Sequence, residues 1–444
     1  MRFILLGLVM LSLLMSCNSK KDSGAKENTT PEIAENSNSS KLNKPRIISD
    51  KAFIKAVSDF RNKRISGDSI RRILRDSISS SFLEKWIKEN ENDTVGSIQS
   101  ILGYLYANGK GCNQDYKRSF ILYQQGANKG IPFAMNGLAV LLENGKGTEK
   151  DLFKAFEWYT KAAEQGDARA QCFLGLCYYN GLGTEKDLFK AFEWCTKSAE
   201  QGDAMAQCFL GLCYYYGVGT EKDLFKAFEW YTKAAEQGDA LAQFKIAGCY
   251  YNGWGTEKDL VKAFEWYTKA AEQGNGDAQY YLAWLFIKGE GVEKNYTKAL
   301  EWSSKSAKQG QRVSKKLVAD ICLNKLVTAE NIDRGLKTLR ELAQDSCCSD
   351  SQYKLGLMYE MGQHVAQDDS KAFELYRASA AQRYSPAEFR LGIFYYEGIA
   401  VQQNKRVGLL WIRNAASDGN QEAKDFLKNL KDHTVDKDYE MSLW

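Results

Sequence analysis

Apolar residues recur every three or four positions along two successive stretches between residues 168 and 201. The first stripe comprises Ala170, Leu174, Cys177 and Tyr178, and the second comprises Ala191, Trp194, Cys195 and Ser198. This period is that of one face of an α-helix. Gly181 and Gly202 follow the two stretches, at the left-handed position that ends many helices. The pattern therefore predicts a helix A, a glycine loop and a helix B, without the alternating runs of a strand.

The same pattern returns at a fixed spacing of 36 residues. Near-identical segments begin at Asp151, Asp187 and Asp223, and weaker copies extend the array over residues 96–430. Residues 311–349 form a degenerate copy that lacks the loop glycines and the tryptophan. A period of 20 to 50 residues is typical of solenoids, propellers and other arrays, and helical units exclude a propeller. We therefore expect an all-α solenoid.

The residues of one unit resemble a known repeat family. Those that carry the resemblance are Ala168, Ala170, Gln171, Leu174, Gly175, Tyr178, Gly181 and Gly183, followed by Lys190, Ala191, Trp194, Lys197, Ala199, Gln201 and Gly202. This pattern is similar to the Sel1-like repeat, a relative of the tetratricopeptide repeat. The resemblance implies a right-handed α-solenoid of about nine helix-loop-helix repeats, acting as a scaffold for a protein or peptide partner.

One stripe of helix A differs between near-identical copies, and we call it the helix-A stripe. In the copy that starts at residue 168 it comprises Arg169, Cys172, Phe173, Leu176 and Asn180. By resemblance to tetratricopeptide-like arrays, helix A lines a concave groove that binds peptides or helices through apolar and aromatic anchors. The expected partner-binding residues are Arg169, Met205, Phe209, Tyr216, Leu241, Lys245, Asp277, Tyr280, Tyr281 and Trp284. The alternative is that several stripe residues pack between helices as core, namely Phe173, Met205, Phe209, Tyr216 and Trp284.

Residues 1–17 have the pattern of an export signal. The apolar run from Phe3 to Met15 is too short to span a bilayer, and Leu14, Ser16 and Cys17 resemble a bacterial lipobox. The resemblance implies that Cys17 is lipidated, so that two or more acyl chains anchor the protein in a membrane. We therefore expect a lipid-anchored protein of the bacterial cell envelope, at the outer membrane. The alternative is a cleaved secretory signal with an incidental cysteine.

Three further segments flank the repeats. Residues 18–44 are rich in Asn, Ser, Lys, Glu and Thr, and we expect a flexible tether because they have little to bury. Residues 45–95 show helical periodicity and are expected to form an N-terminal cap on the array. Residues 431–444 are assigned to a C-terminal tail.

The composition of the 444 residues argues against several functions. The chain has 60 Lys and Arg against 56 Asp and Glu, a net charge of +4, so nothing suggests nucleic-acid binding. The chain has only two histidines, His364 and His433, so we do not expect a metal site or an acid–base pair built from histidines. We expect no metal and no cofactor.

Several of the 11 cysteines recur at the repeat spacing, namely Cys172 with Cys208, and Cys177 with Cys213 and Cys249. Equivalent positions in stacked units should lie about 10 Å apart, beyond the reach of a disulfide. In cysteine-rich Sel1-like proteins a disulfide is thought to join helix A to helix B, and here only Cys195 adds a cysteine on a helix B. One bridge is therefore conceivable, from Cys195 to Cys172 or Cys208. The alternative is that the cysteines are small buried apolar residues.

An enzymatic alternative rests on one short motif. Ser351 and Lys354 form an S-x-x-K pattern that could supply a nucleophile and a base, and some Sel1-like proteins have been associated with β-lactams. No K-T-G follows, and serine is an ordinary helix cap. The sequence therefore favours a non-enzymatic scaffold. The alternatives are an envelope enzyme or binder acting on cell-wall or β-lactam-like substrates, and a glycan-binding surface lipoprotein.

Overall fold

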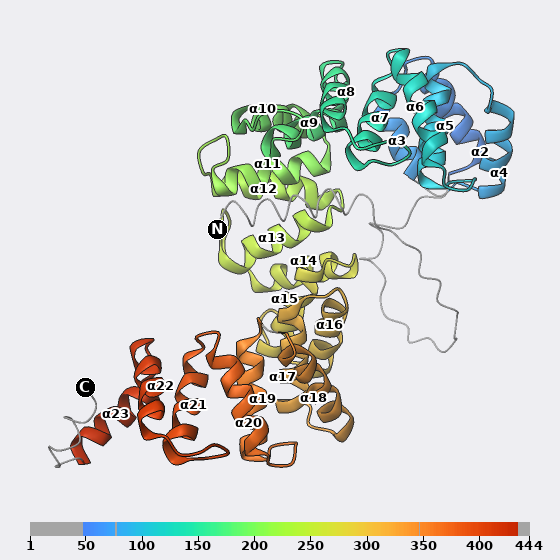
Figure 1. The fold of residues 1–444 in the computed structure, drawn as a ribbon. Coiled ribbons are helices and arrows are strands. Elements are labelled where there is room, and N and C mark those ends of the chain that lie inside the picture. Colours follow the sequence, from blue (N-terminus) through green and yellow to red (C-terminus); the bar gives the residue numbers. More distant parts are fainter. Residues whose placement is uncertain (1–47, 76–77, 346, 434–444) are drawn as a thin grey trace. The chain divides into compact units, whose positions relative to one another are not determined.

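The computed structural model describes residues 48–75, 78–345 and 347–433. Helices are the regular elements of these ranges, and no strand occurs within them (Figure 1). The chain divides into a first compact unit that ends at Lys258 and a second that begins at Asp259. The prediction of an all-α solenoid is confirmed, and the predicted signal and tether lie outside the described residues.

The first unit contains an N-terminal group followed by repeats. The N-terminal group comprises α2 (Asp50–Arg61), α3 (Gly67–Arg75) and α4 (Ser80–Asn90). The A helices are α5 (Gly96–Asn108), α7 (Pro132–Asn144), α9 (Ala168–Asn180), α11 (Ala204–Tyr216) and α13 (Ala240–Asn252). The B helices are α6 (Tyr116–Asn128), α8 (Leu152–Glu164), α10 (Leu188–Glu200) and α12 (Leu224–Glu236).

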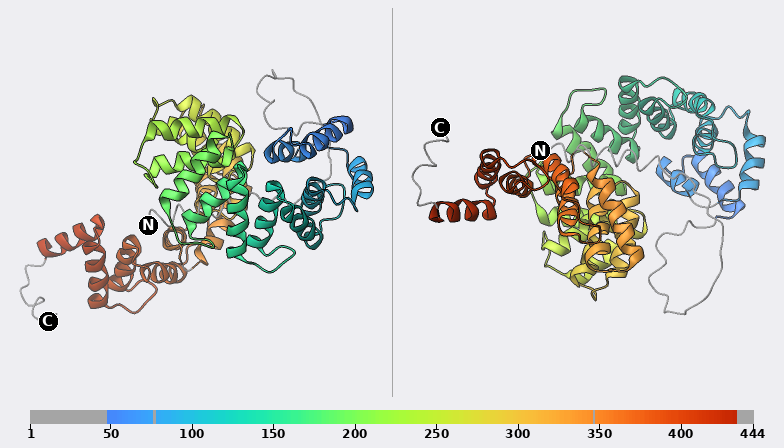
Figure 2. Two further views of the ribbon diagram at one scale, coloured as in Figure 1. Left: turned by 90° about the horizontal axis from the view of Figure 1, so that it is seen from above. Right: turned by 60° about the horizontal axis from the view of Figure 1, so that its bottom comes forward.

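The second unit continues the alternation of B and A helices. Its B helices are α14 (Leu260–Glu272), α16 (Tyr296–Lys308), α18 (Ala329–Ala343), α20 (Asp369–Ala380) and α22 (Lys405–Ser417). Its A helices are α15 (Gly276–Lys288), α17 (Arg312–Asn324), α19 (Ser349–Met361), α21 (Ser385–Glu397) and the final α23 (Gln421–His433). Within each unit, consecutive repeat helices pack side by side (Figure 2). Within the described ranges, no helix combines the length and the apolar character needed to cross a bilayer.

The repeat helices begin and end at residues that favour those positions. Asp167 caps α9 because its Oδ1 accepts a hydrogen bond from the backbone N–H of Ala170 at 2.9 Å. Gly181 ends α9 in the left-handed conformation, with φ of +72°. Asp187 caps α10 by accepting from the backbone N–H of Lys190 at 3.0 Å. An N-cap of this kind stabilises a helix by about 1 kcal/mol, so these boundaries are encoded locally.

In the near-identical copies, the second glycine of the loop brings consecutive repeats together. A Cβ atom at Gly219 would lie 2.1 Å from the carbonyl oxygen of Leu188, the first residue of α10. A Cβ atom at Gly183 would lie at the same distance from the carbonyl oxygen of Leu152, at the start of α8. Only a residue without a side chain lets the loop pass so close to the preceding helix B.

Helix A also meets helix B at a glycine. A Cβ at Gly211 of α11 would lie 2.6 Å from the ring of Tyr231 on α12, whose side chain is buried. Ala227 and Ala234 on the same face of α12 are fully buried. Small residues on both helices therefore allow the close approach that forms the core of a repeat.

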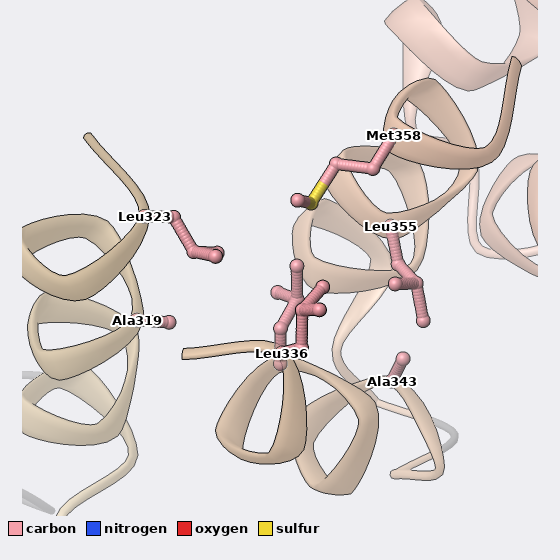
Figure 3. Close-up of a cluster of buried hydrophobic side chains, with 7 residues drawn as sticks. Ala319, Leu323, Leu336, Ala343, Leu355 and Met358 are labelled. Atoms are coloured by element: carbon pink, nitrogen blue, oxygen red, sulfur yellow. The ribbon is translucent and has the colours of Figure 1, made fainter. Parts of the chain in front are cut away.

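The degenerate copy still forms a helix pair, α17 and α18. A hydrophobic cluster packs this pair against α19, and its members are Ala319, Leu323, Leu336, Leu339, Ala343, Leu355 and Met358 (Figure 3). In the loop after α19, His364 replaces the second glycine and keeps a left-handed φ of +60°. Its Nε2 lies 3.2 Å from the carbonyl oxygen of Leu323, so the imidazole connects this loop to α17.

Candidate protein-interaction site

Helix α3 lies on the helix-A stripe at the start of the array. Phe133 on α7 precedes Arg169 by one 36-residue repeat, so it holds a stripe position. The guanidinium of Arg71 on α3 lies 5.0 Å from the centre of the Phe133 ring. A Cβ at Gly67, the first residue of α3, would lie 3.2 Å from the Phe133 Cβ. The backbone of α3 therefore sits directly against the stripe.

Tyr104 on α5 extends this contact surface. It precedes Leu176 by two repeats and so holds another stripe position. The ring centres of Tyr104 and Phe133 are 6.2 Å apart. Burial raises the pKa of Tyr104, and the positive charge of Arg75 on α3 acts in the opposite direction. Two neighbouring A helices thus present aromatic rings to α3.

Charge and apolar burial both hold α3 in place. Arg71 pairs with Asp68 of its own helix, and its Nη2 lies 3.6 Å from Oδ2 of Asp167. The side chains of Arg71 and Asp167 are only 8% and 2% exposed. Ile70 and Leu74 of α3 are fully buried. A short amphipathic helix with apolar anchors and one buried arginine is the kind of ligand that a helix-binding groove accepts.

The expected partner-binding residues of the first unit differ in exposure. Met205 and Phe209 are 7% and 1% exposed, so they belong to the core, as the alternative interpretation held. Phe209 is covered because its ring packs edge-on against Tyr179 of α9, with centres 5.5 Å apart. Tyr216 is 39% exposed. The remaining three are half-buried, namely Arg169, Leu241 and Lys245.

The second unit holds the other four expected residues. Asp277 is exposed and accepts a hydrogen bond from Nε2 of Gln311 at 2.8 Å. Tyr281 is 38% exposed although one face of its ring stacks on Tyr267 at 5.4 Å. The remaining two are half-buried, namely Tyr280 and Trp284. That both sets line one continuous channel stays a prediction.

Sequence reasoning missed three exposed phenylalanines near the start of helix B. Phe153, Phe189 and Phe225 are 74%, 74% and 73% exposed. The sequence pattern could have revealed their exposure, because Phe189 lies about 180° around helix B from the apolar stripe centred on Ser198. An aromatic residue opposite the core stripe faces solvent. This surface is a competing candidate for partner contact.

The conceivable disulfide is not formed. None of the ten cysteines among the described residues takes part in a disulfide. The sulfur of Cys195 lies 3.9 Å from the carbonyl oxygen of Cys172, to which it donates a hydrogen bond. Cys195 takes the place that Tyr231 has two helices later, and its sulfur fills the space beside Gly175. The interpretation of the cysteines as small buried residues is therefore correct at this position.

Thiol labelling should distinguish the cysteines by burial. Cys347 is exposed and Cys112 half-buried, whereas the other eight described cysteines are buried. Burial raises the pKa of Cys112 and raises that of Cys249 to about 12, so their thiols are poor nucleophiles at neutral pH. For the chain without its first 17 residues, we expect fast reaction of Cys347 with a maleimide, slow reaction of Cys112, and all ten reacting in urea. Rapid native labelling of Cys249, seen by peptide mass spectrometry, would contradict this packing.

The S-x-x-K residues are not arranged as a nucleophile and its base. Ser351 is 1% exposed and accepts a hydrogen bond from the thiol of Cys348 at 3.2 Å. Lys354 instead donates to Oδ1 of Asp320 at 3.2 Å. Ser351 is also not a helix cap, because α19 begins at Ser349. Within the described residues, no group of three or more His, Cys, Asp and Glu side chains could hold a metal ion.

Comparison with known proteins identifies the repeat family. The Sel1 repeat model matches residues 99–131, 132–167, 168–203, 204–239, 240–275, 276–311, 349–384 and 385–420. These matches cover more than half of the chain, which therefore belongs to the Sel1-repeat family. The matches stop at residue 311 and resume at 349, on either side of the segment identified as degenerate.

Several individual proteins are similar over parts of their length. DAP3-binding cell death enhancer 1 from Rattus norvegicus is 33% identical over 97 residues, which are 22% of this chain and 18% of that protein. A protective antigen of uropathogenic Escherichia coli with an SLR fold is 29% identical, with 87% of this chain and 88% of that chain covered and a TM-score of 0.44. A Sel1 repeat protein from Oxalobacter formigenes is 29% identical, with coverages of 57% and 96% and a TM-score of 0.48.

The repeats and their packing define the class of this protein. It is a Sel1-repeat solenoid, a class whose members generally serve as protein-interaction scaffolds and are typically non-enzymatic adaptors.

Proposed function

We propose that this protein is a lipid-anchored scaffold of the bacterial cell envelope whose helix-A stripe holds a helical segment of a partner protein. The observation that carries the proposal is the seating of α3 on Phe133, beside which the ring of Tyr104 lies. The chain thereby uses the stripe to bind a helix of its own. Farther along the array, Tyr216 holds a position on the same stripe and is partly exposed to solvent.

The partner contact can be tested by photo-crosslinking in envelopes of the producing bacterium. A photoreactive phenylalanine analogue at position 216 should crosslink to a partner, and the same analogue at Phe189 is the matched control on helix B. Tyr216→Ala with Trp284→Ala should weaken capture of that partner, because an aromatic anchor at a hot spot contributes about 2 kcal/mol, roughly thirtyfold in affinity. The melting temperature should change little, since both side chains are partly exposed.

Two results would contradict the groove proposal. Crosslinking from position 189 alone would move the contact to the exposed phenylalanines of helix B. A folded double variant that captures the partner as well as the unchanged chain would exclude Tyr216 and Trp284 as anchors.

The lipid anchor has a separate test. Cys17 lies outside the described residues, and its proposed role rests on the apolar run and lipobox-like residues before it. Cys17→Ser should move the protein from the membrane to the soluble fraction, because the acyl chains lose their attachment site. A variant that stays in the membrane after a carbonate wash would show that the anchor is elsewhere.

The acylation alternative receives no support from Ser351, whose hydroxyl is buried and hydrogen-bonded to Cys348. Labelling with a fluorescent penicillin provides the direct test. Covalent labelling that is lost in Ser351→Ala would overturn the purely scaffolding function.

A further inference from the structure

A series of glutamine pairs joins the end of helix B to helix A of the same repeat, and we call it the glutamine ladder. In its first pair, Nε2 of Gln201, the residue after α10, donates to Oε1 of Gln171 in α9 at 2.7 Å. The other pairs are Gln237 with Gln207 at 2.8 Å, Gln309 with Gln279 at 2.9 Å, and Gln382 with Gln352 at 2.7 Å. In each pair a residue that follows helix B donates to a residue in the first turn of helix A.

The acceptor glutamines are donors as well. Nε2 of Gln171 donates to the carbonyl oxygen of Ala163 near the end of α8, at 3.1 Å. Gln352 makes the same bond to the carbonyl oxygen of Ala343 at 3.0 Å. Both glutamines are buried. Their amide groups thus connect one helix B, the following helix A and the end of the next helix B.

The last repeat has carboxyl groups at both ladder positions. Glu388 of α21 follows Gln352 by 36 residues, and Asp418, which follows α22, is 36 residues after Gln382. Glu388 is 3% exposed, and its Oε2 has no hydrogen-bond partner among the described residues. An ionised carboxylate only accepts hydrogen bonds. Neither group can then donate as a glutamine amide does, and two acceptors occupy the positions of a donor and an acceptor.

The charges around Glu388 come from both sides of α21. Asp418 faces it from the end of α22, and Arg383 faces it from the turn between α20 and α21. Burial is the largest influence and raises the pKa of Glu388. The charge of Asp418 raises that pKa further, and the charge of Arg383 lowers it. A protonated Glu388 is therefore favoured in the folded chain relative to an exposed glutamate.

We propose that Glu388 is a proton switch that controls how firmly the last repeat, α21 and α22, and the final helix α23 pack on α20. The protonated carboxyl has an O–H group and can donate as the glutamine amide does in the other repeats. Ionisation removes that donor and sets two negative charges against each other. The inference is independent of the proposed groove and of the lipid anchor.

The direction of the pH dependence follows from linkage. The folded chain binds the Glu388 proton more tightly than the unfolded chain does, because the pKa of an exposed glutamate is near 4.5 and the folded chain raises it. Protonation of Glu388 therefore stabilises the fold fully below pH 4.5. This stabilisation is lost as the pH rises through the higher pKa that Glu388 has in the folded chain. The last repeat should therefore be more protected in mild acid than at neutral pH.

Hydrogen exchange measured by mass spectrometry on the whole chain tests the switch at pH 5 and pH 7.5. After correction for intrinsic exchange rates, we expect protection of α21 to α23 to be about tenfold greater at pH 5, the equivalent of 1.4 kcal/mol. Repeats with glutamine pairs should show no such change and serve as the internal control. Equal protection of α21 to α23 at both pH values would overturn the proposal.

Two ladder variants separate the switch from general effects of pH. Glu388→Gln with Asp418→Gln restores the glutamine pair and should give high protection of α21 to α23 at both pH values. Gln352→Glu with Gln382→Asp creates an additional acidic pair one repeat earlier and should extend the pH dependence to α19 and α20. An unchanged pH response in the first variant would overturn the proposal even if the second failed to fold at neutral pH.

Discussion

Replacing Gly219 with alanine is expected to destabilise the first unit by about 3 kcal/mol, the upper end of the usual cost of overpacking a close contact. The new Cβ would lie 2.1 Å from the carbonyl oxygen of Leu188, and backbone cannot rotate away as a side chain can. The left-handed φ of +66° adds strain for any residue with a side chain. Urea unfolding followed by circular dichroism would measure the loss.

Gly217, two residues earlier in the same loop, is the matched control. It also has a left-handed φ, +71°, but a Cβ there would meet nothing nearer than 3.4 Å. Gly217→Ala should therefore cost only about 1 kcal/mol, the conformational term alone. Equal losses in the two variants would show that the loop does not press against the start of α10.

Replacing Leu74 with aspartate should detach α3 from the helix-A stripe. Leu74 is fully buried, and an unpaired carboxylate at that position would cost several kcal/mol if α3 stayed in place. We expect exchange protection of α3 to fall roughly a hundredfold, which corresponds to about 3 kcal/mol. Repeats from α9 onward should stay folded, since repeats in such arrays contact mainly their neighbours.

Arg72→Asp is the control for this prediction, because Arg72 is an exposed residue of the same helix. It also introduces aspartate but should leave α3 protected. If Leu74→Asp leaves α3 protected as well, the stripe does not bind α3 in solution. The central support for the proposed function would then be lost. Unfolding of the whole first unit would instead show that α3 is part of its core.

The local features of the repeats could be predicted from the sequence. Asp167 and Gly181 set the limits of α9 through contacts within a few residues, so the pattern alone located this helix. The period of 36 residues then predicted the solenoid, because each unit has an apolar stripe that only a neighbouring unit can cover. The degenerate segment at 311–349 was visible for the same reason, since it lacks the residues that define a unit.

The candidate site depended on contacts between residues far apart in the chain. The amphipathic pattern of α3 predicts that it packs against a neighbouring element, but only the tertiary structure shows that this neighbour is Phe133 of α7. Met205 and Phe209 have the stripe spacing of exposed anchors, yet the structure buries them. Periodicity gives the direction of a side chain from its own helix, whereas exposure depends on which neighbours cover it.

The ends of the ladder illustrate the same division. The 36-residue register alone aligns Glu388 and Asp418 with glutamines of earlier repeats. Only the packed structure shows that these glutamines hydrogen-bond to each other between helix B and helix A of a repeat, and that Oε2 of Glu388 is buried without a partner among the described residues. The sequence determined which residue types occupy equivalent positions, because repetition is a property of the chain. The tertiary structure decided what those positions do, because burial and partners come from other helices.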